Sequence, residues 1–350
     1  VNMRVAREAD VPVILVADVN RGGALASIVG TLELLGEDRK RVKGLIFNKF
    51  QGDVALFQNA VTWIEKKTGI KVLGVMPWLN DIMIDSEDSL SVNWKTRINK
   101  NAKLTIGVVQ LPFATNLTDL DDFDFEPDVQ LVEIDKNSSF DLLNAIIIPS
   151  TENPVSDMTY LKESEIARKI IDFSKNGGII FGIGGGYQIM GETLDYRGFA
   201  INDKKTETDG LGIIPVRTVC DGEKDSGKVF GQSVHSQIKN KIPIIGNKLY
   251  FDKTELYQKE KDFEPLFEFD GTPDGFANQS IKIAATSIHD IFKNDKFRNF
   301  WLNIIRRSKE LPELETIDMR ASKEKNYDAL ATKVKENIDI DYVLKNIIKI

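Results

Sequence analysis

Residues 178–191 read GIIFGIGGGYQIMG, and this stretch decides the fold of the second half of the chain. The apolar run 178–182 predicts a buried strand, and residues 187–194 predict a short helix. The glycines between them permit a turn too tight for larger residues. A strand, a tight turn and a helix with small residues around the centre are typical of a nucleophile elbow.

Residue 184 lies at the tip of this predicted elbow. A thiol there would have a lowered pKa, because it would lie beside backbone N–H groups at the start of a helix. The residue is Gly184, which carries no nucleophile, and no Ser, Thr or Cys adjoins it in the sequence. The pattern therefore predicts the frame of a nucleophilic site without its nucleophile.

Apolar runs alternate with amphipathic segments on either side of this stretch. Further strands are predicted at 104–110, 129–134 and 145–148, with a helix over 160–174. An earlier set has strands at 12–17, 42–47 and 72–76, and helices at 24–35 and 53–67. Such runs are typical of parallel sheets covered on both faces. We expect two α/β units that meet near residues 97–103, followed by helices over 297–307 and 326–350.

The composition fits a two-domain protein. The chain has 350 residues, 42% of them hydrophobic, which is too long for one ordinary core. A net charge of −7 gives no electrostatic case for nucleic acid, and the lack of an 18-residue apolar run predicts no membrane helix. No signal-peptide pattern is present, so a cytoplasmic location is expected. The abrupt start at Val1 suggests an N-terminally incomplete chain.

One cysteine and two histidines limit the catalytic chemistry. Cys220 alone excludes an intramolecular disulfide and a cysteine zinc cluster, and we interpret it as an ordinary thiol. His235 and His289 are the histidine candidates for a catalytic base.

Polar residues follow the first two predicted strands. Asp18, Asn20 and Arg21 precede two glycines, and Asn48 and Lys49 end the second strand. Ligands of open α/β sheets bind at the carboxyl ends of the strands, where Asp18 could hold Mg²⁺ for a nucleotide phosphate. A solvated turn that enters a helix is an equally good interpretation of Asp18 alone.

The phosphate-binding motif G-x-x-x-x-G-K-[ST] does not occur in the sequence. Either the chain does not use ATP, or the loop lies outside the residues given. The abrupt start favours the second interpretation.

The motifs of the first unit resemble those of the cobyric acid synthase family of cobalamin biosynthesis. That family reads D-I-D-R-G-G, N-K-F-R-G-D, G-V-x-P and E-D-S-L. This chain has DVNRGG, NKFQGD, GVMP and EDSL at residues 18–23, 48–53, 74–77 and 87–90. Asn20 replaces an aspartate and Gln51 an arginine. The resemblance therefore predicts weaker Mg²⁺ binding at position 20.

The second unit resembles the glutaminase half of the same family. Its elbow reads G-I-C-G-G-Y-Q-M-L-G, so Gly184 occupies the position of the cysteine nucleophile. His289, in TSIHDIF, matches the base of G-T-Y-L-H-G-x-F. The P-G-S-K-N loop, which can supply an oxyanion donor together with Gly185, is here PSTEN, so Ser150 replaces a glycine and Glu152 reverses a charge. His235 is retained in GQSVH, where the family has G-Y-E-I-H.

The resemblance implies a fold and a reaction. The fold would be a dethiobiotin-synthetase-like P-loop-type parallel sheet, incomplete here, over residues 1–98. A class I, triad-type, flavodoxin-like glutamine amidotransferase domain would cover 99–308, and a helical tail 309–350. The reaction would use ATP and Mg²⁺, with no tightly bound cofactor. It would amidate peripheral carboxylates of a corrinoid acid, adenosylcobyrinic acid a,c-diamide.

The departures predict that glutaminase activity is lost. Ammonia would then come from solution rather than from glutamine, or the reaction would no longer occur. A non-catalytic ligand-binding or partner protein on the same scaffold is the alternative. The sequence leaves the acceptor and the oligomeric state open.

Overall fold

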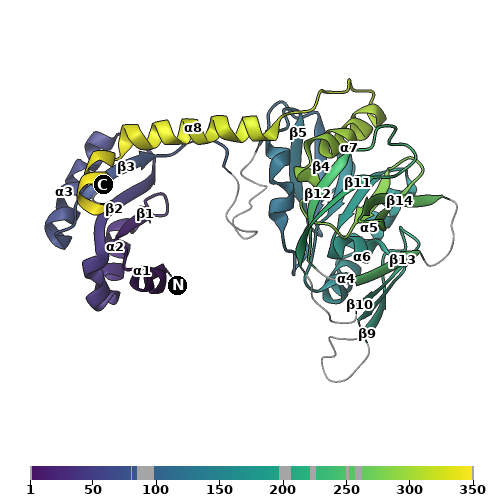
Figure 1. The fold of residues 1–350 in the computed structure, drawn as a ribbon, viewed down its shortest axis with the longest axis horizontal. Helices are drawn as coiled ribbons and strands as arrows, with labels where there is room; N and C mark the ends of the chain where they lie inside the picture. Colours follow the sequence, from purple (N-terminus) through teal and green to yellow (C-terminus); the bar gives the residue numbers. More distant parts are fainter. Residues whose placement is uncertain are drawn as a thin grey trace. The chain divides into compact units, whose positions relative to one another are not determined.

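The computed structural model describes residues 2–79, 81–84, 98–196, 206–220, 226–249, 252–256 and 262–348. The chain forms two compact units, Val1–Ile84 with Arg320–Ile350, and Asp85–Met319 (Figure 1). The predicted meeting point at residues 97–103 adjoins residues 85–97, which lie outside the described residues. The EDSL motif at 87–90 also lies outside them.

The first unit contains a parallel sheet with the strand order β1-β2-β3. Its strands are β1 (Val13–Asp18), β2 (Val42–Phe50) and β3 (Val72–Pro77), and its first helices are α1 (Asn2–Glu8), α2 (Ala24–Leu34) and α3 (Val54–Thr68). A 3₁₀ segment, Gly36–Arg41, joins α2 to β2. Asp53 caps α3 by accepting a hydrogen bond from the Ala55 N–H at 2.8 Å.

Alternate residues of these strands face opposite sides of the sheet. Leu45 and Phe47 are fully buried and pack on the side that carries Ile28 and Ile64 of α2 and α3. Leu73 belongs to a separate cluster on the other side. The expectation that both faces are covered is therefore confirmed.

The second face is covered by the end of the chain. Leu73 and Met76 of β3 pack with Ile338 and Ile347, which follow α8 (Met319–Asn337). Gly74 pairs with Ile338 in an antiparallel bridge, and the Asp339 N–H donates to the Leu73 carbonyl at 2.8 Å. Figure 1 shows these yellow segments beside β3. The predicted tail over 309–350 therefore divides near Met319.

The predicted helix over 326–350 is wrong in its continuity. α8 ends at Asn337 because the backbone of Ile338 and Asp339 pairs with β3. The chain resumes as α9 (Ile340–Tyr342) and a last helical segment, Val343–Ile348.

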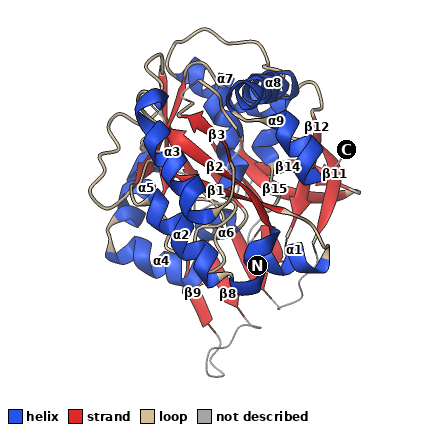
Figure 2. Cartoon of the chain, turned by 90° about the vertical axis from the view of Figure 1, so that its left-hand side faces the viewer, coloured by secondary structure: helices blue, strands red, loops and turns tan. Residues whose placement is uncertain are grey.

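The described residues of the second unit form two sheets, whose strands are drawn in red in Figure 2. Among the described residues, the larger sheet has the order β12 (Pro243–Lys248), β11 (Gly227–Ser233), β14 (Phe263–Phe269), β15 (Thr272–Asn278), β16 (Ile283–Thr286), β7 (Ile179–Ile183), β6 (Ala145–Ile148), β4 (Leu104–Val109) and β5 (Val129–Ile134). The last five strands are parallel. The smaller sheet has the order β13 (Asp252–Leu256), β10 (Val216–Cys220), β8 (Thr193–Tyr196) and β9 (Thr206–Asp209).

Two helix predictions in this unit are wrong. The segment predicted as one helix over 160–174 forms α4 (Pro154–Glu163) and α5 (Ile166–Lys175). The break arises because the Ser164 hydroxyl donates back to the Tyr160 carbonyl at 2.7 Å and Glu165 has a φ of 63°. The helix predicted over 187–194 is α6 (Gly185–Met190), and Leu194 belongs to β8.

Helix α7 (Asp295–Ser308) is tied to the loop between β4 and β5 by buried ion pairs. Arg298 and Arg306 are both 0% exposed. The Arg298 Nε donates to the Glu126 Oε1 at 2.8 Å, and Arg306 forms a fork to both oxygens of Asp128 at 2.7 and 3.0 Å. These contacts fix the 3₁₀ segment Leu117–Phe125, which immediately precedes Glu126.

A Gly74→Ala substitution is expected to destabilise the first unit by about 1–3 kcal/mol. A Cβ on Gly74 would lie 1.9 Å from the Asn337 carbonyl oxygen, so the C-terminal segment would have to move. Hydrogen–deuterium exchange at residues 337–348 should become faster.

The matched control for this prediction is Gly30→Ala in α2. A Cβ on Gly30 would meet nothing within 4 Å, so this variant should be neutral or stabilised by about 0.5–1 kcal/mol. Equal exchange in the two variants would contradict the close approach of the chain end to β3.

Candidate functional site

The predicted elbow is present between β7 and α6. Gly184 has φ 53° and ψ −120°, a conformation that strongly favours glycine. Its N–H donates to the Thr286 carbonyl at 2.9 Å, and its carbonyl accepts from Tyr187 at 3.0 Å. The structure therefore confirms Gly184 at a strand-to-helix turn.

The direction in which a side chain at position 184 would point can be read from the backbone. A Cβ there would lie 3.0 Å from the His289 Nε2 and 2.5 Å from the Ser150 Oγ. A side chain at the tip would therefore point toward the predicted base. The Ser150 hydroxyl already fills part of the space that this side chain would need.

His289 is held by an acidic residue that the sequence analysis missed. Its Nδ1 lies 2.8 Å from the Asp119 Oδ2, and both side chains are buried. This contact directs the Nδ1 toward Asp119 and the Nε2 toward position 184. Burial raises the pKa of the Asp119 carboxyl, and the hydrogen bond with His289 acts in the opposite direction. The three positions have the layout of a nucleophile, base and acid triad.

Asp119 gave only a weak sequence signal. It is one of several acidic residues within the otherwise apolar segment Leu117–Phe125. Its partner, His289, is 170 positions away, and no local pattern connects the two.

The loop after β6 contacts the elbow through Ser150, and its role as an oxyanion donor stays a prediction. Ser150 was expected to lie in a loop that donates N–H groups to an oxyanion. Its Oγ accepts a hydrogen bond from the Gly185 N–H at 3.4 Å. The next residue, Thr151, packs so closely that a Cβ on Gly185 would lie 2.6 Å from its carbonyl oxygen.

His235 lies in a separate environment. Its Nδ1 accepts from the Gln237 N–H at 3.2 Å, and its buried Nε2 has no hydrogen-bond partner. Burial lowers the pKa of His235. These contacts give His235 no role at the elbow. Cys220 ends strand β10, and its side chain lies outside the described part of the structure.

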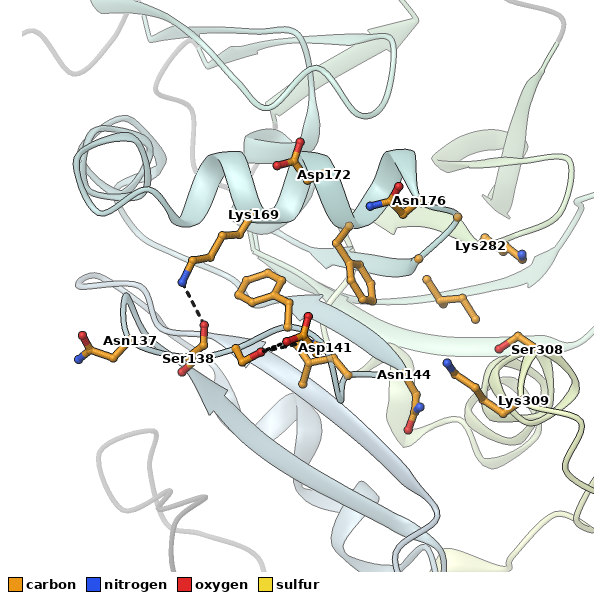
Figure 3. Close-up of a pocket in the computed structure, with 17 residues that line it drawn as sticks. Asn137, Ser138, Asp141, Asn144, Lys169, Asp172, Asn176, Lys282, Ser308 and Lys309 are labelled. Atoms are coloured by element: carbon orange, nitrogen blue, oxygen red, sulfur yellow. Dashed lines mark hydrogen bonds between the residues drawn. The ribbon is translucent and has the colours of Figure 1, made fainter.

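A cavity of about 790 Å³ lies at the amino ends of strands β6 and β7, opposite the end that carries the elbow (Figure 3). Its lining includes Gly178 and Asn144, which precede β7 and β6, and Lys169, whose Nζ donates to the Ser138 carbonyl at 3.0 Å. Ligands of open α/β sheets bind at the carboxyl ends of the strands, where the elbow lies. This cavity is therefore not the candidate active site.

The polar residues of the first unit gather at the carboxyl ends of β1 and β2. Asp18 and Asn48 are register partners, and the Lys49 Nζ lies 3.1 Å from the Asp18 Oδ2. The hydrogen bond from Lys49 lowers the pKa of Asp18, and the N–H of Asn20 adds to this effect. Arg21 is exposed at the same edge.

The two departures from the family motif in this unit contact one another. The Gln51 Nε2 donates to the Asn20 Oδ1 at 3.1 Å. An aspartate and an arginine at these positions would form an ion pair, whereas this chain has a neutral amide pair. The lost carboxylate at position 20 is therefore matched by a lost guanidinium.

The carboxyl ends of β1 and β2 offer few ligands for a metal ion. Within the parts of the chain that the structure describes, no group of three or more His, Cys, Asp or Glu side chains could hold a metal ion. Mg²⁺ usually takes one or two carboxylates and completes its shell with phosphate oxygens and water, which Asp18 alone can support.

A Lys49→Met substitution is expected to raise the pKa of Asp18 toward the ordinary aspartate range, because the hydrogen bond that favours the carboxylate is lost. Carboxyl-carbon NMR titration measures this value. The control is Lys71→Met, because Lys71 makes the analogous pair with Asp339 and lowers the pKa of that residue. It should raise the pKa of Asp339 and leave that of Asp18 unchanged. An unchanged Asp18 in Lys49→Met would contradict the pairing.

No helix in the described parts of the chain has the length and apolar character needed to cross a bilayer.

Comparison with known proteins identifies both units. Residues 105–297 match the CobB/CobQ-like glutamine amidotransferase domain, and residues 1–86 match an AAA domain. A solved structure described as a glutamine amidotransferase is 14% identical with a TM-score of 0.43, over 57% of this chain and 98% of that one.

Two curated relatives extend over almost the whole chain. Cobyric acid synthase of Geobacillus kaustophilus is 34% identical over 98% of this chain and 68% of its own length. Cobyric acid synthase of Carboxydothermus hydrogenoformans is 37% identical over 97% of this chain and 68% of its own length. The predicted fold class is confirmed, with a P-loop-type first unit and a glutamine amidotransferase second unit. The chain belongs to the cobyric acid synthase family.

Proposed function

We propose that this chain takes part in the ATP-dependent amidation of peripheral carboxylates of adenosylcobyrinic acid a,c-diamide and has lost the glutaminase activity of its family. The observation that carries the second part is Gly184. This residue occupies the tip of an elbow that is aimed at His289, and it has no side chain to act. A base without a nucleophile cannot form the thioester through which a cysteine glutaminase releases ammonia.

The synthetase chemistry would take place at the carboxyl ends of β1 and β2. The carboxylate of the corrinoid acid is converted by ATP to an acyl phosphate, and ammonia displaces the phosphate. Asp18 would help to hold Mg²⁺, and Arg21, Asn48 and Lys49 would contact phosphate or base groups of the nucleotide. In the absence of a glutaminase nucleophile, the ammonia would come from solution.

The ion pair between Asp18 and Lys49 supports one alternative. Lys49 already neutralises the carboxylate that would hold the metal ion. A non-catalytic protein that binds a ligand, or serves as a partner subunit, could use the same scaffold. ATP turnover that depends on a corrinoid acid distinguishes the two functions.

The natural chain is expected to release no glutamate from glutamine, and Gly184→Cys alone should recover little. The cysteine Cβ would lie 2.5 Å from the Ser150 Oγ, and its backbone would be strained at φ 53°. The double variant Gly184→Cys with Ser150→Gly removes the clash and should exceed the single variant by about 10-fold or more. Glutamate release measured by an enzyme-coupled assay gives the three rates.

Gly184→Ala with Ser150→Gly is the matched control. Its residue 184 must adopt the same strained backbone conformation, and the clash with the Ser150 hydroxyl is removed in the same way. It carries no thiol, so it should remain inactive. Glutamate release by the natural chain would refute the lost glutaminase, and full activity in the single variant would show that only the nucleophile is missing.

Ammonium chloride, but not glutamine, is expected to support phosphate release from ATP in the presence of the corrinoid acid when these residues are joined to a phosphate-binding loop. The 350-residue chain alone should not hydrolyse ATP, because its sequence lacks the phosphate-binding loop. Inorganic phosphate release is the measurement, with the corrinoid acid omitted as the control. Equal rates with and without the corrinoid acid would favour the alternative function.

A further inference from the structure

Positions 150 and 184 carry reciprocal replacements. Relative to the family motifs, Ser150 replaces a glycine and Gly184 replaces a cysteine. The two residues adjoin in space, because the Ser150 Oγ lies 2.5 Å from the place of a Cβ on residue 184. The side chain that is missing from the elbow is therefore replaced by a hydroxyl from the neighbouring loop.

The base and its acidic partner lie beside the same point. The His289 Nε2 is 3.0 Å from the place of that Cβ, and Asp119 holds the Nδ1 on the other side of the ring at 2.8 Å. Ser150, His289 and Asp119 are each less than 5% exposed. The hydroxyl and the imidazole thus flank a single atomic position.

We propose that Ser150, His289 and Asp119 form a relocated catalytic triad that cleaves carboxylic esters. Ser150 is the nucleophile, His289 is the general base and acid, and Asp119 orients the imidazole. The contact between Ser150 and His289 has to close by rotation of the serine side chain, and catalytic contacts often tighten only when substrate is bound. This activity is separate from the amidation proposed above, and neither depends on the other.

The reaction balances as an ordinary acyl transfer. The Ser150 Oγ attacks the ester carbonyl carbon while its proton moves to the His289 Nε2. The ester C–O bond then breaks, and the alcohol leaves with the proton from His289. Water, deprotonated by His289, attacks the acyl-serine and releases the carboxylic acid together with the free hydroxyl.

The N–H of Gly185 lies beside the proposed nucleophile and can donate to the oxyanion once the Oγ is bonded to the acyl carbon. It donates to the Ser150 Oγ at 3.4 Å, so it lies next to the atom that becomes bonded to the acyl carbon. Esters are the expected substrates because an alkoxide or phenolate leaves more readily than the amine of a carboxamide. This distinction is consistent with the expected lack of glutaminase activity.

A fluorophosphonate probe tests the proposal in the natural chain. The probe should label Ser150, as located by peptide mass spectrometry, and 4-nitrophenyl acetate should be hydrolysed. Ser150→Ala should abolish both, whereas Ser280→Ala, which changes an exposed serine, should alter neither. His289→Gln should slow labelling by about 10²-fold or more.

Two further variants separate a triad from incidental reactivity. Asp119→Asn should slow labelling, because the imidazole loses the carboxylate that directs its Nδ1 away from Ser150 and leaves the Nε2 to accept the serine proton. Gly184→Ala should also slow labelling, since its Cβ displaces the hydroxyl. Circular dichroism checks that each variant is folded. The proposal is overturned if the natural chain is not labelled at Ser150, or if folded His289→Gln is labelled as fast as the natural chain.

Discussion

The buried ion pairs of Arg298 and Arg306 hold α7 against the segment that follows β4, and the rest of the second unit's candidate site depends on this contact. Both guanidinium groups are removed from water. They share the carboxylates of Asp122, Glu126, Asp128 and Asp295, so the loss of Glu126 or Asp128 would leave their buried charge less well compensated. These pairs connect α7 to the segment after β4. Asp119 lies on that segment, so the orientation of His289 depends on contacts that have no part in the chemistry.

Each unit contains one pair of departures from the family motifs that adjoin in space. Asn20 contacts Gln51 in the first unit, and Ser150 adjoins the space above Gly184 in the second. In the first pair, two amides take the place of two opposite charges, so the local net charge is unchanged. In the second pair, the side chain lost at position 184 is replaced by a side chain gained at position 150. A single departure considered alone is therefore misleading. The loss of the carboxylate at position 20 leaves no arginine unpaired, because position 51 carries Gln51 in place of the family's arginine. These four changes have the character of coupled replacement rather than independent decay.

Sequence was sufficient where the decisive interactions are local. Continuous apolar runs predicted the parallel strands, and the glycines of 182–186 predicted the elbow, because each property belongs to a short segment. Sequence was insufficient where a distant segment decides the outcome. Asp119 acquires its role only through His289, and the helix over 326–350 is interrupted only because Ile338 pairs with β3. The break at Glu165 was also missed, since its positive φ is not marked by a glycine.

The C-terminal cover of the first sheet makes the order of synthesis important for folding. Lys71 and Asp339 are 268 positions apart, so their contact closes a loop that contains the whole second unit. As the chain leaves the ribosome from its N-terminus, β1, β2 and β3 can pair early while one apolar face still lacks its cover. That face remains a site for incorrect association until residues 338–347 emerge. Residues 338–347 therefore determine when this face of the first sheet is covered.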